Sequence, residues 1–239
     1  MTKKTFSPQS DKVGQMFDSI SHKYDFLNHF LSMGIDKAWR KKLISELKKH
    51  NPAKVLDVAT GTADLAIQLS RNSDCIIHGI DISEMMLEEG QKKITQQKLK
   101  NRIQLIQAAA EKIPFDANEY DAAMAAFGVR NFYHLLTGLL EMHRVLKPDG
   151  WIYILEFSKP KTFAVRQIYQ FYFRFILPLA GGLISGNFEA YRYLPRTVNA
   201  FPDGQNFLKI MQDAGFTQTT EHSLSFGIAT LYIGKKEAV

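Results

Sequence analysis

One stretch of the sequence combines small residues and carboxylates in a spacing that suits nucleoside binding. Residues 55–65, VLDVATGTADL, read as an apolar strand that passes through a tight turn of small residues into a helix. The next expected strand, CIIHGID, ends at Asp81. Such a turn lets a ligand approach the main chain, and a carboxylate on the neighbouring strand can accept hydrogen bonds from both ribose hydroxyls. The spacing predicts a nucleoside site, and the alternative is that Asp57 and Asp81 only cap helices.

The residues of the turn decide between two kinds of ligand. Dinucleotide binders use G-x-G-x-x-G, because the pyrophosphate lies against helix N-terminal amides that must be clear of side chains. Here Gly61 is flanked by Ala59 and Ala63, and Asp64 adds a negative charge in the first turn of the helix. Asp57 places a further carboxylate near the same crevice. These residues favour the cationic nucleoside S-adenosylmethionine over NAD.

The composition is that of a soluble globular domain. The chain has 239 residues, of which 45% are hydrophobic and 23% charged, and we treat 1–239 as a single domain. The polar N-terminus MTKKTFSPQSDK lacks the apolar segment of a secretory signal, which predicts a cytoplasmic protein. The net charge of +6 permits an anionic partner. No basic run alternates with aromatic residues, so we expect no nucleic-acid partner.

Strand and helix patterns alternate along the middle of the chain. Such alternation indicates a parallel, doubly wound sheet with helices on both faces. The motif KPDG at 147–150 is expected to end a helix. Strands are expected at about 53–58, 75–80, 103–107, 120–125 and 151–156, and helices at about 12–21, 26–32, 37–49, 63–71, 84–98 and 133–146.

The end of the chain departs from this alternation. Residues 158–202 interrupt it, and a helix at about 205–214 resumes it. FTQTTEHSLSF and GIATLYIGKK then read as two strands around a turn near 225–227. A terminal antiparallel pair predicts the seven-stranded, mostly parallel, Rossmann-like α/β sheet of class I S-adenosylmethionine-dependent methyltransferases. We expect a helical lid at 1–50 and a helical insertion at 158–202.

Four blocks of sequence resemble the ubiquinone/menaquinone biosynthesis C-methyltransferases, over nearly the whole chain. They are YDFLNHFLSMGIDKAWR at 24–40, VLDVATGTADLA at 55–66, FGVRNF at 127–132 and RVLKPDGWIYILEFSKP at 144–160. The first and last resemble the two signatures of that family. Three residues depart from the pattern of this family. Asp36 replaces a histidine, Asp149 replaces the first glycine of the motif KPGG, and Ala63 replaces a glycine of the turn. None of them removes a group that must do chemistry.

The resemblance implies a reaction and a set of cofactor contacts. It is closest to the members that methylate demethylmenaquinol, an isoprenoid-tailed reduced naphthoquinone, at a ring carbon with S-adenosylmethionine as the methyl donor. Thr62 at the turn and Asp81 on the ribose hydroxyls would bind the donor. Ala109 and Ala110 would lie beside its adenine, offering only main-chain polar groups.

Methylation at carbon needs an electron-rich ring, which a quinol supplies when a hydroxyl loses its proton. Free phenols have a pKa near ~10, so the site must stabilise the anion. Arg130 and Asn131, at the end of the fourth expected strand, are the candidates, and the alternative is that Arg130 only pairs with Glu156 or caps the strand. Water, Asp25 or His134 would accept the proton. No residues have metal-ligand spacing, so we expect no metal.

Two segments are candidates to cover the site. Tyr24, Asp25 and Asn28 would belong to a lid, or alternatively only pack and cap a short helix. Residues 164–184 are rich in Phe, Tyr, Ile and Leu, but the uncharged run 175–188 has 14 residues, against about 20 for a membrane span. We expect this segment to cap the isoprenoid tail and to touch the inner face of the cell membrane. A homodimer interface and plain core are the alternatives.

The interpretation as a quinol C-methyltransferase has two competitors. A benzoquinol, a sterol or a fatty acid would be an alternative acceptor, because the cofactor half of the chain is shared among such enzymes. A non-catalytic S-adenosylmethionine-binding scaffold of a quinone-synthesis assembly is the other. Turnover with defined acceptors separates all three.

Overall fold

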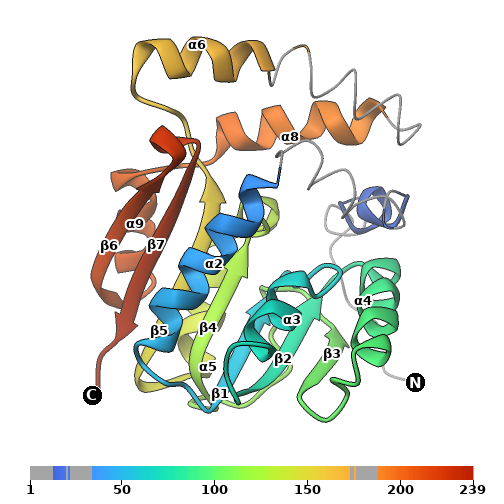
Figure 1. Ribbon diagram of the computed structural model, residues 1–239. Coiled ribbons are helices and arrows are strands. Elements are labelled where there is room, and N and C mark those ends of the chain that lie inside the picture. The colour runs from blue at the N-terminus through green and yellow to red at the C-terminus, as the bar shows by residue number, and fades with distance from the viewer. Residues whose placement is uncertain (1–12, 20, 22–33, 173–174, 176–187, 239) are drawn as a thin grey trace.

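A seven-stranded sheet forms the centre of the molecule. The structure is a computed structural model that describes residues 13–19, 21, 34–172, 175 and 188–238 (Figure 1). The strand order is β3-β2-β1-β4-β5-β7-β6. Neighbouring strands from β3 to β5 are parallel, and β7 runs antiparallel to β5 and to β6. The predicted seven-stranded, mostly parallel sheet is confirmed.

The elements follow the alternation expected from the sequence. The strands are β1 Lys54–Val58, β2 Ile76–Asp81, β3 Ile103–Gln107, β4 Tyr120–Ala126, β5 Leu146–Phe157, β6 Phe216–Leu224 and β7 Ala229–Lys236. The helices are α2 Ile35–Lys48, α3 Asp64–Ser70, α4 Glu84–Gln96, α5 Leu135–Val145, α6 Phe163–Phe171, α8 Phe188–Ala200 and α9 Gln205–Asp213. Short 3-10 turns occupy Val129–Asn131 and Ser225–Gly227. Residues 13–19 are also helical, and the helix expected at 26–32 lies outside the described residues.

Helices cover both faces of the sheet because both faces are apolar. Leu43 of α2 and Leu69 of α3 are buried against one face. Leu139 of α5 and Phe207 of α9 are buried against the other. Each such side chain stabilises the fold by about 1.5–3 kcal/mol, so these two layers hold the strand ends in place.

Two helices lie beyond the carboxyl ends of the parallel strands. α8 crosses this end of the sheet, and α6 lies outside α8 (Figure 1). Both belong to the segment 158–202, whose residues 173–174 and 176–187 are outside the described residues. No described helix is both long enough and apolar enough to span a membrane.

The start of β5 differs from the prediction. α5 ends at Val145, as KPDG indicated, but β5 begins at Leu146 and not near residue 151. Tyr120 pairs with Leu146, whereas Ala122 already pairs with Trp151, so residues 147–150 form an irregularity within the strand. The proline and glycine therefore mark a bulge and not a loop between helix and strand.

Two of the residues that depart from the family pattern have the backbone conformation that glycine favours. Asp149 and Ala63 both have a φ of 63°. A left-handed conformation costs a residue with a Cβ atom roughly 1 kcal/mol or more. The glycines of the family pattern thus fit the backbone of this fold.

We expect Asp149→Gly to raise the free energy of unfolding by about 0.5–1 kcal/mol, because glycine adopts this φ without strain. Asp149 Oδ1 lies 2.6 Å from Lys235 Nζ, but the Asp149 side chain is 63% exposed, so losing this ion pair costs little. Urea denaturation measures the change. Lys235→Gln removes the ion pair together with the contact between Lys235 Nζ and the Trp151 ring, 5.9 Å from its centroid, and serves as the control, with an expected change below about 1 kcal/mol. A less stable Asp149→Gly protein would contradict this explanation.

Candidate functional site

The turn between β1 and α3 is fixed by main-chain hydrogen bonds and by one carboxylate. Left-handed backbone turns the chain sharply, with φ values of 56° at Ala59, 56° at Gly61 and 63° at Ala63. The Thr60 N–H donates to the Ile80 carbonyl at 2.9 Å, which ties the turn to β2. The Gly61 N–H donates to Asp81 Oδ2 at 2.8 Å. The turn therefore keeps its shape through β2.

Asp81 is held in place by two main-chain donors. Its Oδ2 accepts from the Gly61 N–H, and its Oδ1 accepts from the Ser83 N–H at 2.9 Å. Burial raises the pKa of the Asp81 carboxyl, and the hydrogen bonds from Ser83 and Gly61 oppose that shift. A carboxylate has about four lone-pair sites, so Asp81 can still accept from a ligand beside these main-chain donors. The carboxylate is thus oriented before a ligand arrives.

A cleft opens beside this turn at the carboxyl ends of the strands. It is only partly enclosed, and the empty space of about 670 Å³ beside its lining includes open solvent. Its described lining carries two acids, Asp81 and Glu111, and one amide, Asn131, but no lysine, arginine or histidine. Aromatic walls come from Phe17, Phe127, Phe132 and Tyr133. The cleft is therefore acidic and apolar.

The structure brings some of the predicted site residues to the cleft. Its lining includes Asp81, Ala110 and Asn131. Four others lie on the same elements without belonging to the described lining: Asp57, Thr62, Ala109 and Arg130. Tyr24, Asp25 and Asn28 lie outside the described residues. The roles of all ten residues stay predictions.

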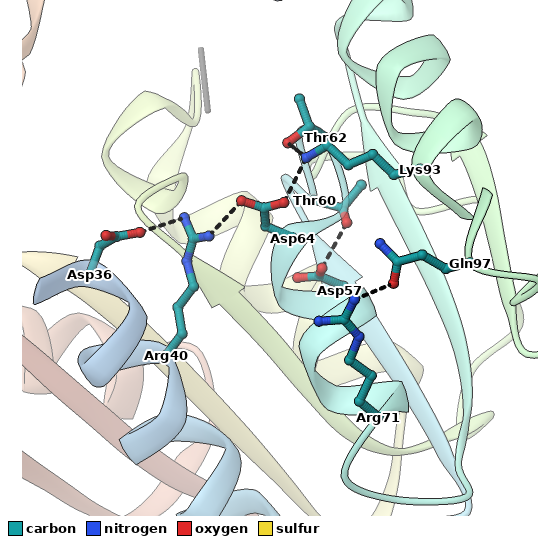
Figure 2. Close-up of polar contacts among 9 residues, drawn as sticks. All are labelled: Asp36, Arg40, Asp57, Thr60, Thr62, Asp64, Arg71, Lys93 and Gln97. Atoms are coloured by element: carbon teal, nitrogen blue, oxygen red, sulfur yellow. Dashed lines mark hydrogen bonds and ion pairs between the residues drawn. The ribbon is translucent and has the colours of Figure 1, made fainter. Parts of the chain in front are cut away.

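Asp57 lies beneath the turn and is fully buried. Its Oδ2 accepts from the Thr60 hydroxyl at 2.7 Å (Figure 2). Burial raises the pKa of the Asp57 carboxyl to about 7, although Thr60 and Arg40 act in the opposite direction. Burial therefore disfavours the charged form of Asp57, and a cation bound nearby would stabilise it.

A chain of alternating charges links α2, α3 and α4 next to the turn (Figure 2). Lys93 Nζ donates to Thr62 Oγ1 at 2.9 Å and to Asp64 Oδ1 at 2.6 Å. Arg40 Nη1 donates to Asp64 Oδ2 at 3.1 Å, and Asp36 lies 3.8 Å from Arg40. The charge of Asp64 is thus compensated by two cations. The expectation that Asp64 repels a pyrophosphate is weakened, and the lining of the cleft becomes the better guide to its ligand.

Arg130 is part of a buried ion pair. Its Nη1 lies 2.7 Å from Glu156 Oε1, and its main-chain N–H donates to Glu156 Oε2 at 3.2 Å. Nη1 also donates to the Phe127 carbonyl, and the Phe157 N–H donates to Glu156 Oε1 at 2.8 Å. The Glu156 side chain is completely buried. The alternative prediction that Arg130 pairs with Glu156 is confirmed, and an electrostatic role in the reaction stays a prediction.

Tyr193 of α8 reaches the site and was missed by sequence reasoning. Its hydroxyl donates to Asn131 Oδ1 at 3.2 Å. Burial raises the pKa of the Tyr193 phenol, with Arg130 opposing the shift. No local pattern marks this tyrosine, because its contact joins residues far apart in the sequence. His134 donates its main-chain N–H to Glu111 Oε1 at 3.1 Å and does not belong to the described lining.

The helical residues 13–19 lie against the cleft. Val13 and Phe17 line it. Asp18 Oδ1 accepts from the Ser83 hydroxyl at 2.5 Å and from the Met85 N–H at 3.3 Å. These bonds attach the segment to the start of α4. Among the described residues, no group of three or more histidines, cysteines and carboxylates is placed to hold a metal ion.

Comparison with known families identifies the group to which this arrangement belongs. Residues 5–236 match the model of the ubiE/COQ5 methyltransferase family. The chain belongs to this family. The match spans the turn, Asp81, Asn131 and Tyr193, so the cleft described above lies within the matched residues.

Curated relatives are similar over almost their whole length. The ubiquinone/menaquinone biosynthesis C-methyltransferase UbiE of Geotalea daltonii is 43% identical, over 95% of this chain and 97% of that protein. The demethylmenaquinone methyltransferase of Bacteroides fragilis is 42% identical, over 95% and 94%. That of Porphyromonas gingivalis is 39% identical, over 97% and 96%.

Solved structures share the fold at low sequence identity. The [4+2]-cyclase SpnF superimposes with a TM-score of 0.69 at 16% identity and covers 98% of both chains. A possible histamine N-methyltransferase of Thermotoga maritima gives 0.66 at 15% identity, over 94% of this chain and 99% of that one. Since one of these proteins is named a cyclase, the fold alone does not fix the reaction.

We expect Glu156→Gln to lower the free energy of unfolding by about 3 kcal/mol, because it leaves the buried charge of Arg130 uncompensated while keeping the side-chain shape. Chemical denaturation gives the measurement. Glu89→Gln is the matched control, since Glu89 Oε1 also lies 2.7 Å from a cation, Lys92, but at the surface. The control should leave the denaturation midpoint unchanged. If the two substitutions lowered the free energy of unfolding equally, burial of the Arg130–Glu156 ion pair would not increase its contribution to stability.

Proposed function

We propose that this protein transfers the methyl group of S-adenosylmethionine to a ring carbon of demethylmenaquinol, giving menaquinol. The observation that carries the proposal is the composition of the cleft, whose described lining holds two carboxylates and no cation. A sulfonium and an ammonium suit such a lining, whereas the pyrophosphate of NAD would find no positive side chain there. Membership of the ubiE/COQ5 methyltransferase family and relatives named for this substrate support the same choice.

The residues present fit the methyl donor. We assign its ribose hydroxyls to Asp81, which two amides already orient, and its adenine to the main chain at Ala109 and Ala110. Nothing lies within 4 Å of the position that a Cβ atom would take at Gly61, so the turn presents bare backbone to the cleft. S-adenosylmethionine supplies an electrophilic methyl group. Thr62 is bonded to Lys93 and would contribute by shaping the turn.

The acceptor would lie between the aromatic walls of the cleft and Asn131. Because Asn131 Oδ1 accepts from Tyr193, the group that Asn131 can offer a quinol oxygen is its Nδ2 donor. Arg130, the residue before Asn131, would favour the deprotonated quinol electrostatically, with Glu156 fixing its position. Water remains the simplest proton acceptor, since His134 does not belong to the described lining.

An isoprenoid-tailed acceptor also implies a place of action. We propose that the protein works in the cytoplasm at the inner face of the cell membrane. The segment 158–202, with Tyr193 reaching Asn131, would cover the acceptor and its tail. A homodimer is the alternative use of the same segment.

The proposed function is tested by methyl transfer from labelled S-adenosylmethionine to a panel of acceptors. We expect label in demethylmenaquinol and at most weak labelling of a benzoquinol, a sterol or a fatty acid. Product analysis should place the methyl group on carbon and not on oxygen. Labelling of another acceptor in place of the naphthoquinol would refute the substrate, and no turnover with any acceptor would favour a scaffold.

The affinity for S-adenosylmethionine should rise as the pH increases through about 7 and then level off. A cationic ligand favours the ionised form of Asp57, whose pKa burial raises to about 7 in the free protein. Calorimetry across this pH range, in buffers of different ionisation enthalpy, measures affinity and proton release together. Asp57→Asn should remove the pH dependence. If the affinity of the wild-type protein did not change across this pH range, ligand binding would not be coupled to the ionisation of Asp57.

The reaction role of Arg130 is tested by a double variant that keeps the site neutral. Arg130→Met with Glu156→Gln removes both buried charges, which avoids the unpaired charge that a single change would leave. We expect methyl transfer to fall by about a hundredfold, the usual effect of losing one preorganised electrostatic group. Affinity for S-adenosylmethionine should stay within a few-fold. Unchanged turnover would assign Arg130 a structural role only.

A further inference from the structure

The helix α6 exposes large apolar side chains on its outward side. Phe163 is 68% exposed, Ile168 70% and Phe171 58%. Tyr169, in contrast, is buried. Three large apolar side chains exposed on a helix of this length are unusual for a surface that meets only water. The outward side of α6 therefore has the form of a contact surface.

A third exposed aromatic residue lies in a turn that contacts the chain just before α6. Phe226, in the turn between β6 and β7, is 81% exposed and has a φ of 59°. This turn is attached to the chain before α6, because the Ser158 hydroxyl donates to the Gly227 carbonyl at 2.9 Å. A Cβ atom at Gly227 would lie 3.4 Å from Pro160. We call Phe163, Ile168, Phe171 and Phe226 the α6 surface.

The charges of the segment that carries α6 have one sign, and one of its cations, Lys159, pairs with Asp203, whose Oδ1 lies 3.1 Å from Lys159 Nζ. No aspartate or glutamate occurs in the sequence between Glu156 and Glu189, and this stretch carries Lys159, Lys161, Arg166 and Arg174. The Arg166 guanidinium lies over the Phe163 ring, 5.8 Å from its centroid. Exposed aromatic residues with cations beside them are typical of proteins that bind an anionic lipid surface.

We propose that the α6 surface docks the protein on anionic lipid bilayers. The same positive charge on both partners would oppose a symmetric contact between two copies through this surface, whereas anionic headgroups match it. α6 and α8 lie beyond the carboxyl ends of the parallel strands (Figure 1), and the residues that line the cleft lie at these strand ends, so docking turns this end of the molecule toward the bilayer. The proposal rests on the proposed function in one respect, because a lipid-borne acceptor gives the docking its purpose.

Sedimentation with vesicles tests the docking without using turnover. The full-length protein should bind vesicles that contain phosphatidylglycerol and bind pure phosphatidylcholine weakly, with binding reduced by added salt. Ile168→Gln with Phe171→Gln should lower the partition coefficient at least about tenfold. Lys161→Gln with Arg166→Gln should lower it about fivefold for each charge removed.

Matched controls separate this surface from general stickiness. Leu136 and Leu140 of α5 are also exposed, so Leu136→Gln with Leu140→Gln removes similar side chains elsewhere. Lys98→Gln with Lys100→Gln removes two exposed charges elsewhere. Both controls should bind vesicles like the wild type. Circular dichroism and S-adenosylmethionine affinity should be equal in all variants, which excludes unfolding as the cause.

Three results would overturn the proposal. The first is that the wild-type protein does not bind anionic vesicles. The second is that the α6 variants and the control variants lose vesicle binding to the same extent. The third is that sedimentation velocity shows a wild-type dimer that the α6 substitutions dissociate. The last would assign the surface to a second copy. Failure of methyl transfer to demethylmenaquinol, with vesicle binding intact, would instead refute the proposed function alone.

Discussion

The hydrogen bond from the Gly61 N–H to Asp81 Oδ2 joins the two strand ends on which the site depends. It fixes the turn after β1 to the end of β2, and the Ser83 N–H holds the other oxygen of Asp81. Gly128, just after β4, packs closely on the same turn. A Cβ atom at Gly128 would collide with the Ala59 side chain. The ends of three parallel strands therefore define the cleft, held together by the Asp81 carboxylate and by the close packing of Gly128 on Ala59.

The charges near the cleft are arranged so that its interior remains acidic. Lys93 and Arg40 are bonded to Asp64, and Arg130 is bonded to Glu156. These cations do not belong to the described lining, where Asp81 and Glu111 lie. A positive ligand would thus meet two carboxylates and, among the lining residues that the structure describes, no lysine, arginine or histidine. This distribution, more than the number of glycines in the turn, supports the proposal that the site binds a sulfonium and not a pyrophosphate.

The sequence predicted the sheet well because parallel strands buried on both faces are continuous apolar runs with turns at their ends. It placed Asp81 and Asn131 at the cleft because the carboxyl ends of such strands meet at one edge. It could not show that Thr62 bonds to Lys93, or that Asp64 is compensated by two cations, since those contacts join separate helices. The contact of Tyr193 with Asn131 was missed for the same reason. The start of β5 was also missed, because the strand includes a bulge at Asp149 that the periodicity of the sequence does not reveal.

The central claim is that Asp81 and the turn after β1 bind a cationic nucleoside that donates a methyl group. Crystals soaked separately with S-adenosylhomocysteine and with NAD test it most directly, because the thioether has the same ribose and adenine as the donor. We predict that the ribose hydroxyls of S-adenosylhomocysteine donate to Asp81, with the adenine beside Ala109 and Ala110, and that NAD does not bind. NAD in the cleft, or the S-adenosylhomocysteine ribose away from Asp81, would contradict the claim.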